Sequence, residues 1–313
     1  MYRSNLKEEI MIKSVLITGA NAGLGKETAR QLALEGVEKI FLGCRNEAKA
    51  QTAKEDLENS TGKSVFEILK IDVSNLDSVR AAIEALPEPV EALVMNAGGM
   101  GGVNFDDITK DGVTQIFAVN VLGHVVLAEG LVAAKKLTNV AIYAGSEAAR
   151  GVKEMGMKRP DLKSSSADEF ATIADGSFHG NISDPNIAYG SIKYMGALWM
   201  SSLARKHKDI RFVTMSPGAT YGTEGMNHIP LFKRIVFTAM FKMLALFGNS
   251  HGVDKGAKRY VDGLLDQSFK SGVFYGSKSG TAGPLAVQSK LFADLADEHI
   301  QDNASEAIHR FIK

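Results

Sequence analysis

Short β-branched runs and longer amphipathic stretches alternate along the first two thirds of the chain. The run Ser14 to Thr18 (SVLIT) is typical of a strand that is covered on both faces of a sheet. Gly19 follows it at once, and the composition from Gly25 to Leu34 is helical. The same cycle predicts further strands and helices: strands at Lys39 to Gly43, Val65 to Ile71, Glu91 to Met95, Asn139 to Tyr143, Ile210 to Met215 and Gly272 to Tyr275, and helices at Asn46 to Glu58 and from near Leu76.

This alternation decides the fold class. Strands that alternate with helices of roughly a dozen residues need right-handed crossovers, which make the strands parallel and place helices on both faces. We therefore predict an α/β fold with a doubly wound parallel sheet. The sequence shows no internal repeat and no linker, so we expect one domain over residues 14–313 after a short leader at 1–13.

Two segments interrupt the alternation. Residues 150–187 are polar and irregular, and this length predicts a surface insertion near a site. In residues 220–248, a basic face opposes an apolar helical face. We expect this segment to be a substrate lid, with peripheral membrane contact through 229–247 as the alternative. Its lysines and arginine argue against a helix that spans a membrane.

The composition excludes several classes of protein. An apolar fraction of 45% with 23% charged residues excludes a disordered chain, and 36 basic against 36 acidic side chains disfavour a dedicated nucleic-acid binder. One cysteine, Cys44, can build neither a disulfide framework nor a cysteine zinc cage, and it fits a reducing compartment. The charged amino terminus lacks the apolar run of an export signal, so we expect a cytoplasmic protein.

The string TGANAGLG lies between the first predicted strand and its helix. Gly19 can form the tight turn, Gly23 lets the backbone approach a ligand, and Gly25 allows the helix to pack closely on the strand. The helix that begins here directs free N–H groups toward an anion, so a pyrophosphate fits. A plain tight turn is the alternative, and the position after the first strand argues against it.

The ends of the next strands carry further candidate binding residues. Arg45 follows the second strand, where a carboxylate would bond the ribose 2′-hydroxyl of NAD, and a guanidinium instead suits the 2′-phosphate of NADP(H). A solvated arginine is the alternative. Ligands of such sheets bind outside the carboxyl ends of the strands. The third and fourth strands end there with polar or small residues: Asp72, Val73, Asn96, Ala97 and Gly98.

A proton-transfer group is predicted from the helical stretch AYGSIKYMGALW. Tyr189 and Lys193 are four residues apart, so their side chains share one helix face. A nearby cation stabilises a phenolate and would lower the pKa of Tyr189 toward neutrality. Ser146 could donate a hydrogen bond to the same substrate oxygen, and Asn120 could hold a water beside Lys193. An isolated Tyr and Lys at this spacing is common and need not be functional.

With these motifs the chain resembles the short-chain dehydrogenase/reductase family. TGANAGLG is similar to the family's TGxxxGxG turn and MNAG to its NNAG element, and the catalytic tetrad is matched in order. The match runs from about residue 14 to residue 218. Within the family, GANAGLGKETARQLA, GCRN and NVLGH are most similar to the retinol dehydrogenase and protochlorophyllide reductase branch.

The resemblance implies a Rossmann-like fold and a role for each matched residue. Tyr189 would be the general acid/base, Lys193 would lower its pKa and bind the nicotinamide ribose, Ser146 would steady the substrate oxygen, and Asn120 would hold a relay water. The remaining matches would bind the cofactor: Gly19, Asn21, Gly23, Leu24 and Gly25 at the pyrophosphate, Asp72 and Val73 near adenine, Asn96, Ala97 and Gly98 at the adenosine and ribose side, and Pro217 and Gly218 near the nicotinamide.

Some residues depart from the family pattern or have an ordinary interpretation. The family places about a dozen residues between the serine and the tyrosine, whereas residues 147–188 intervene here, which implies a lid or an extra wall. Met95 replaces the first asparagine of NNAG, at a position that we expect to face the sheet. His124 is predicted to be a packing residue, His179 and His228 to be solvated, and no residue pattern indicates a metal site.

We therefore predict an NADP(H)-dependent oxidoreductase that acts on the carbonyl or alcohol carbon of a hydrophobic small molecule. An NADP(H)-binding sensor with the same fold and little catalysis is the alternative. Family members often form dimers or tetramers, which leaves a homo-oligomer open. The sequence identifies neither the substrate nor the direction of the reaction.

Overall fold

The structure is a computed structural model that describes residues 12–100, 102–152, 157–180, 184–222 and 250–313. Most of the predicted leader and of the segment 220–248 lies outside these residues, including all of 229–247 and His228. The expectations for a lid or a membrane contact there therefore stay predictions.

One eight-stranded sheet runs through the described chain in the order β10-β9-β6-β5-β4-β1-β2-β3. Seven strands are parallel, and β10 pairs antiparallel with β9 at the edge. The predicted doubly wound α/β sheet is confirmed, and β10 is the strand of this sheet that the sequence analysis missed. It also missed β7 (Thr220–Tyr221) and β8 (His251–Gly252), which pair in a separate two-stranded sheet. The strands are β1 (Ser14–Thr18), β2 (Lys39–Cys44), β3 (Phe66–Lys70), β4 (Val90–Met95), β5 (Leu137–Ala144), β6 (Arg211–Met215), β9 (Val273–Ser277) and β10 (Leu285–Val287).

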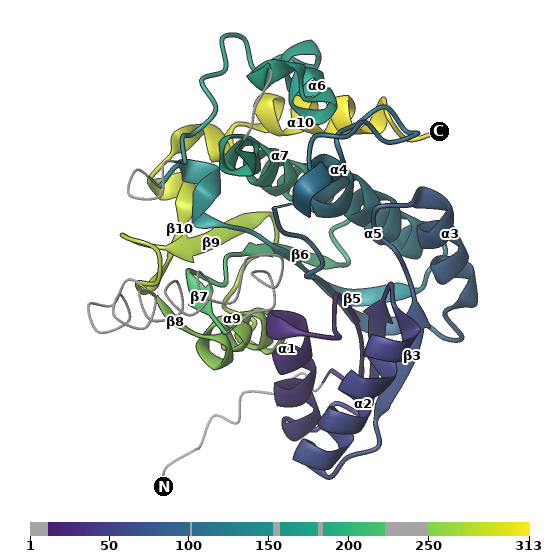
Figure 1. Cartoon of the computed structure of the whole chain (residues 1–313). Coiled ribbons are helices and arrows are strands. Elements are labelled where there is room, and N and C mark those ends of the chain that lie inside the picture. The colour runs from purple at the N-terminus through teal and green to yellow at the C-terminus, as the bar shows by residue number, and fades with distance from the viewer. Residues whose placement is uncertain (1–11, 101, 153–156, 181–183, 223–249) are drawn as a thin grey trace, which may run out of the picture.

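Helices cover both faces of this sheet (Figure 1). On one face lie α1 (Gly23–Leu34), α2 (Glu47–Thr61) and α9 (Val253–Leu265), and on the other α3 (Leu76–Ala85), α5 (Gly123–Ala133) and α7 (Pro185–Lys206). Successive residues of β1 enter opposite cores, since Leu16 packs with the α5 and α7 side and Ile17 with the α1 side. The strand is buried on both faces, which explains its continuous apolar run.

The insertion contains a helix that the sequence analysis did not predict. Helix α6 (Ala167–Asp175) begins after Ser166, whose side chain accepts a hydrogen bond from the Glu169 backbone N–H. The Glu169 carboxylate accepts bonds in return from the N–H groups of Ser164 and Ser165. Serine followed three residues later by glutamate is the pattern of a capping box, and this signal could have located the helix.

Helix α10 (Glu298–His309) and α6 form an extra layer over α7 (Figure 1). His309 of α10 reaches the Glu129 carboxylate of α5 at 2.7 Å, and the same glutamate accepts a hydrogen bond from the Trp199 indole of α7 at 2.8 Å. Helix α10 therefore packs on α7 and α6 and is bonded to α5 through His309.

The stretch Gln115–Ala133, which ends with α5, is long and apolar enough to cross a membrane by length and composition, with a mean hydropathy of 1.9. However, 67% of it is buried inside the fold. It begins with the short helix α4 (Gln115–Phe117) and then passes through one π-helical turn at Ala118–Leu122. Such turns are rare and are frequently found at functional sites.

Strand order reverses between β1 and β4. From β1 the chain continues outward to β2 and β3, and from β4 it continues in the opposite direction to β5 and β6. The crossovers therefore diverge at this point and leave a crevice at the carboxyl ends of the two strands. Most residues predicted to bind the cofactor follow strands that end at this edge, whereas Tyr189 and Lys193 lie on α7.

Candidate active site

Two adjoining cavities open at the carboxyl edge of the sheet. The larger has a volume of about 460 Å³ and the smaller about 290 Å³, and both are lined by Leu24, Gly145, Tyr189 and Pro217. Most predicted cofactor residues line the larger cavity: Gly19, Asn21, Gly23, Leu24, Arg45, Asp72, Val73, Asn96, Ala97, Gly98, Tyr189, Lys193 and Pro217. Ser146 and Gly218 line the smaller one, whereas Gly25 and Asn120 line neither.

The glycine turn is built as its residues require. Gly19 and Gly23 have φ angles of 66° and 53°, a left-handed conformation that glycine adopts without steric cost. A Cβ on Gly25 would lie 2.5 Å from the Gly19 carbonyl oxygen and 2.6 Å from Asn96 Nδ2. Gly25 therefore allows helix α1 to pack closely against Gly19 and Asn96, while the neighbouring residues of the turn line the cavity.

Thr18 holds the end of β4 against this turn. Its hydroxyl oxygen accepts hydrogen bonds from the N–H groups of Asn96 and Ala97, both at 2.9 Å. The hydroxyl also lies 3.1 Å from His124 Nε2, and His124 Nδ1 lies 3.3 Å from the Asn120 carbonyl oxygen. A carbonyl can only accept, so Nδ1 carries the proton, Nε2 accepts, and Thr18 donates to it.

Neutral His124 thus links the glycine turn to the helix that bears Asn120. The side chain is fully buried, and burial together with the charge of Lys193 lowers its pKa to about 3. The prediction of a packing residue is correct, and the structure adds this hydrogen-bonding role. His179, expected to be solvated, is half-buried with its ring edge on Phe178.

Tyr189 and Lys193 both project from α7 toward the junction of the cavities. The Tyr189 hydroxyl is hydrogen-bonded to the Ser146 side chain. Lys193 Nζ lies 5.5 Å from the centre of the Tyr189 ring and donates a hydrogen bond to the Ala144 carbonyl oxygen at 2.9 Å. The structure therefore brings together three of the four predicted catalytic side chains.

The protonation of this pair differs from the sequence expectation. Burial raises the pKa of Tyr189 to about 12; the hydrogen bond to Ser146 opposes this shift and the charge of Glu147 adds to it. Burial also lowers the pKa of Lys193 to about 7. The predicted lowering of the phenol pKa by Lys193 is thus not seen in this structure, because desolvation disfavours the charged form of both groups.

Asn120 occupies the middle of the π-helical turn and is fully buried. Its amide nitrogen donates to the carbonyls of Gly99 at 2.7 Å and Ile116 at 2.8 Å, and Oδ1 accepts from the Gly99 N–H at 3.1 Å. Its backbone carbonyl accepts from the Tyr143 hydroxyl at 2.9 Å. In this arrangement Asn120 positions the loop after β4, and the relay water that it was predicted to hold stays a prediction.

Tyr143 is one of the site residues that sequence reasoning missed. It lies on β5, and the face of its ring is 5.1 Å from Lys193 Nζ, a geometry that favours an ammonium ion. Glu147 and Arg259 were also missed, and they form a buried ion pair beside Ser146. A buried tyrosine inside an apolar strand and a glutamate directly after Ser146 were the only signals in the sequence.

Arg45 and Cys44 end the second strand in different environments. The Arg45 side chain is 74% exposed at the rim of the larger cavity, and its guanidinium lies 3.9 Å from an Asp72 carboxylate oxygen. Cys44 is buried, and burial raises the pKa of its thiol to about 11. The thiol is therefore protonated and unreactive, as the sequence predicts.

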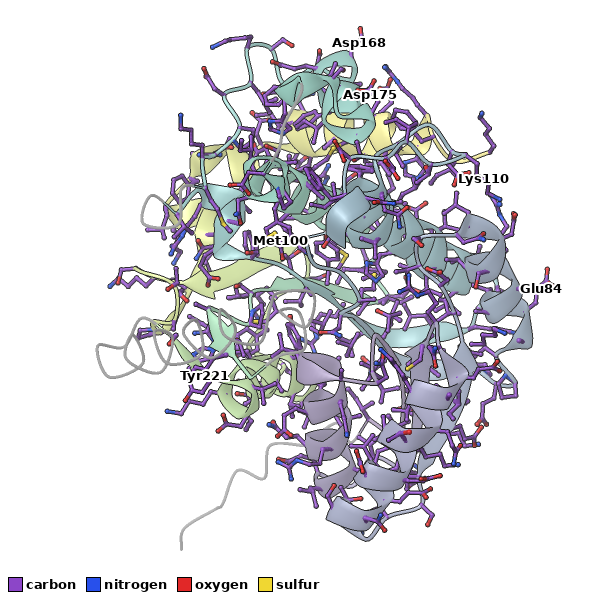
Figure 2. All side chains as sticks on the ribbon, viewed as in Figure 1. Glu84, Met100, Lys110, Asp168, Asp175 and Tyr221 are labelled. Atoms are coloured by element: carbon purple, nitrogen blue, oxygen red, sulfur yellow. The ribbon has the colours of Figure 1, made fainter. Side chains whose placement is uncertain are left out.

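The smaller cavity is walled largely by apolar side chains. Ala148, Val152 and Met157 form a cluster against which Met100 and Tyr189 pack. In the view of Figure 2, the label of Met100 lies below that of Asp175 of α6 and above that of Tyr221. This composition suits an apolar ligand next to the Tyr189 hydroxyl.

Comparison with known proteins relates the chain to one family. The family model for short chain dehydrogenase matches residues 13–151. Protochlorophyllide reductase B, chloroplastic, of Oryza sativa subsp. japonica is 28% identical over 310 residues, 93% of this chain and 75% of that protein. Retinol dehydrogenase 12 of Bos taurus is 39% identical over 118 residues, 37% of this chain and 36% of that protein. The chain thus matches about a third of that dehydrogenase's length.

Solved structures share the fold. A putative uncharacterized protein from Mycobacterium paratuberculosis has a TM-score of 0.68 at 21% identity, over 96% of this chain and 92% of that one. The NADPH-bound carbonyl reductase from chicken fatty liver has a TM-score of 0.56 at 17% identity, and the match covers 87% of this chain and 99% of that one. The 3-ketoacyl-(acyl-carrier-protein) reductase from Brucella melitensis, complexed with NADH, has a TM-score of 0.57 at 23% identity, and the match covers 84% of this chain and 95% of that one.

Proposed function

This chain belongs to the short-chain dehydrogenase/reductase family, and we propose that it is an NADP(H)-dependent oxidoreductase of hydrophobic carbonyls and alcohols. Within the family it is most similar to the retinol dehydrogenase and protochlorophyllide reductase branch. One observation carries the proposal: a half-buried tyrosine, hydrogen-bonded to a serine and one helical turn from a lysine, lies where the two cavities meet.

The larger cavity fits a dinucleotide. Gly19, Asn21 and Gly23 of the glycine turn line it, and helix α1 begins at this turn. In the proposal the pyrophosphate lies on Gly19 to Gly25, adenine near Asp72 and Val73, and the nicotinamide near Pro217 and Gly218. The bound cofactor would supply or accept the hydride.

Arg45 is the residue that we assign to the choice of NADP(H). It stands at the carboxyl end of β2, on the rim of the same cavity as Asp72. A guanidinium at this place forms charge-assisted, forked hydrogen bonds with a phosphate and offers no acceptor to a ribose hydroxyl. The structures of relatives with NADPH and with NADH leave this choice to experiment.

We assign the proton transfer to Tyr189. With a pKa of about 12 its hydroxyl is protonated at neutral pH and stands ready to give a proton to a carbonyl oxygen as hydride reaches the carbon. Ser146, already hydrogen-bonded to this hydroxyl, would bind the same substrate oxygen. In the reverse reaction the phenolate would take the proton from the alcohol, which needs a higher pH.

Lys193 is assigned two tasks. Its ammonium would stabilise the phenolate left on Tyr189 after proton transfer, because opposite charges in a buried site attract strongly. It would also donate hydrogen bonds to the nicotinamide ribose. The contacts with Ala144 and with the face of Tyr143 fix its head at the wall of the larger cavity.

The substrate class follows from the smaller cavity. Its described wall, formed by Leu24, Met100, Ala148, Val152 and Met157, offers a substrate mostly apolar contacts next to Tyr189 and Ser146. A hydrophobic aldehyde, ketone or alcohol fits this surface. Single-domain organisation, cytoplasmic location and membrane contact through 229–247 stay predictions.

Turnover with a panel of substrates tests this function against the alternative of a sensor. Purified protein with NADPH should oxidise the cofactor in the presence of at least one apolar aldehyde, ketone or quinone, followed by the loss of absorbance of the reduced nicotinamide. A small polar carbonyl of the same class serves as the control and should react more slowly. Binding of NADPH without oxidation across the panel would favour the sensor.

A further inference from the structure

The carboxylate of Glu147 is buried directly behind the candidate catalytic serine. Its side chain is 5% exposed and belongs to the 3₁₀ turn Glu147–Arg150 that follows Ser146. One carboxylate oxygen accepts hydrogen bonds from the Ser277 N–H at 2.9 Å and hydroxyl at 2.8 Å, and the other accepts one from the Ser216 hydroxyl. Three donors therefore satisfy both oxygens of this buried carboxylate.

Arg259 of α9 supplies the opposite charge. One guanidinium nitrogen lies 3.8 Å from the Glu147 carboxylate, and the arginine side chain is 11% exposed. The same nitrogen donates to the Ser216 carbonyl oxygen at 3.1 Å, and the other donates to the Gly283 carbonyl oxygen at 2.7 Å. The pair therefore joins the turn after β5, the loop after β6, the end of β9 and helix α9.

This pair adjoins both walls of the proposed reaction site. The Ser216 hydroxyl, which donates to Glu147, accepts from the Gly218 N–H at 3.1 Å and so shapes the turn assigned to the nicotinamide. Glu147 itself lines the smaller cavity together with Ser146 and Tyr189. Its negative charge acts on the Tyr189 hydroxyl and raises the pKa of that group.

Several titratable groups face this pair or the hydroxyl it influences. Arg259 and Tyr260 approach Glu147 from α9, and His251 approaches from the short strand His251–Gly252. Lys193 Nζ lies 5.5 Å from the centre of the Tyr189 ring and 5.1 Å from the centre of the Tyr143 ring. Among the described residues, Glu147 is the acidic side chain that acts on Tyr189, so its removal changes one negative charge at the phenol.

We propose that Glu147 and Arg259 are positioning residues, a buried ion pair that fixes Ser146 and the Ser216–Gly218 turn and sets the charge at the Tyr189 hydroxyl. The inference rests on the proposed function, in which Tyr189 transfers the proton. Arg259 offsets the carboxylate, while the carboxylate keeps Tyr189 protonated and thereby favours reduction at neutral pH.

Glu147→Gln tests the inference, because the amide keeps the shape and can bond Ser216 and Ser277 while it removes the charge. We expect the pH midpoint for alcohol oxidation, which reports the phenolate, to fall by about half a unit or more. Arg259→Gln leaves the carboxylate without its partner and should move the midpoint upward, whereas Arg259→Lys should retain the wild-type midpoint.

Glu129→Gln is the matched control, since it removes a partly buried, hydrogen-bonded carboxylate far from the site. Its midpoint should equal that of the unaltered protein. If Glu147→Gln and Glu129→Gln give the same midpoint, the inference is wrong. Where Glu147→Gln fails to fold, the opposite behaviour of Arg259→Gln and Arg259→Lys decides, and identical midpoints for these two variants also overturn it.

A measurement without turnover separates this inference from the proposed function. Tyrosinate absorbance is titrated in the full chain and in Tyr189→Phe, and the difference isolates Tyr189. The same subtraction in the Glu147→Gln background should show ionisation at lower pH. A shifted titration in a protein that reduces no substrate would support the inference and contradict the function. An unshifted titration in an active enzyme would contradict the inference and support the function.

Discussion

Replacing Arg45 with alanine should weaken the binding of NADPH and leave that of NADH unchanged. The guanidinium stands at the carboxyl end of β2, where the 2′-phosphate of NADP(H) would lie. Its side chain is 74% exposed, and its contact with Asp72 is long at 3.9 Å. An exposed ion pair of this kind contributes about 0.2–1 kcal/mol, so the fold should tolerate the change.

The size of the effect follows from the exposure. A hydrogen bond to a charged group contributes about 1.5–3 kcal/mol when the site is sheltered. Water screens a side chain as exposed as Arg45, so we take the lower end, about 1.5 kcal/mol, which corresponds to roughly a tenfold weaker Kd for NADPH. NADH has no 2′-phosphate and should bind with unchanged affinity.

Fluorescence titration of both cofactors at low and at physiological salt measures this change. The loss for NADPH should shrink as salt rises, because the interaction is between an exposed charge and a phosphate. Arg80→Ala removes an exposed arginine from α3, away from the cavity, and serves as the control. Equal NADPH affinity in Arg45→Ala and Arg80→Ala, or an equal loss for NADH, would refute the assignment.

Three further predictions follow from the structure. The pKa of Tyr189 is raised to about 12 and that of Lys193 is lowered to about 7, so carbonyl reduction, which uses the Tyr189 proton and the Lys193 ammonium, should slow as the pH rises from about 6 to 9; a reduction rate that is flat over this range would contradict it. The hydrogen bond to Glu129 raises the pKa of His309. Burial acts to raise the pKa of Glu129, but the hydrogen bonds from His309 and Trp199 outweigh it, so the pKa of Glu129 is lowered. The Glu129–His309 pair therefore stabilises the fold most between about pH 4.5 and 6.5 and less on either side. The difference in Tm between the unaltered protein and His309→Gln should be largest in this range. A difference in Tm that does not change with pH would argue against the pair. Gly25→Ala would place a Cβ 2.5 Å from a carbonyl oxygen and should destabilise the protein by about 1–3 kcal/mol in urea unfolding; an unchanged midpoint would show that the turn has room.

The extra layer formed by α6 and α10 also bears on assembly. Family members often associate through the helices that here are α5 and α7. In this chain α10 packs on α7, and its His309 is bonded to Glu129 of α5. A homo-oligomer through this face would have to displace α10, and sedimentation of the protein with and without residues 298–313 would show whether it does.

Local chemistry decided how much of the fold could be predicted. The strand Ser14–Thr18 was predicted to the residue, because a β-branched run between a charged leader and Gly19 has one plausible boundary at each end. Helix α6 was missed because polar composition outweighed a capping signal at Ser166. Strand β10 was missed because three residues at a sheet edge carry too little pattern to recognise.

In the candidate site, too, local sequence patterns could be predicted and contacts between distant segments could not. Motif residues such as Tyr189 and Lys193 could be named because their spacing along one helix fixes their relation in space. The partners that set their protonation come from elsewhere in the chain. Arg259 meets Glu147 across 112 residues of sequence, and the Tyr143 ring faces Lys193 only after β5 and α7 have packed. Local spacing cannot report such contacts, and for this reason the direction of the Tyr189 pKa shift was not foreseen.

The turnover of Tyr189→Phe tests the central claim most directly. The substitution removes one hydroxyl and keeps the ring on α7, so the Tm and the Kd for NADPH should stay close to those of the unaltered protein. We expect kcat for carbonyl reduction to fall by about 10²–10⁴-fold, the usual contribution of a positioned general acid. A variant that binds NADPH normally and reduces its substrate at the original rate would show that the proton comes from another group.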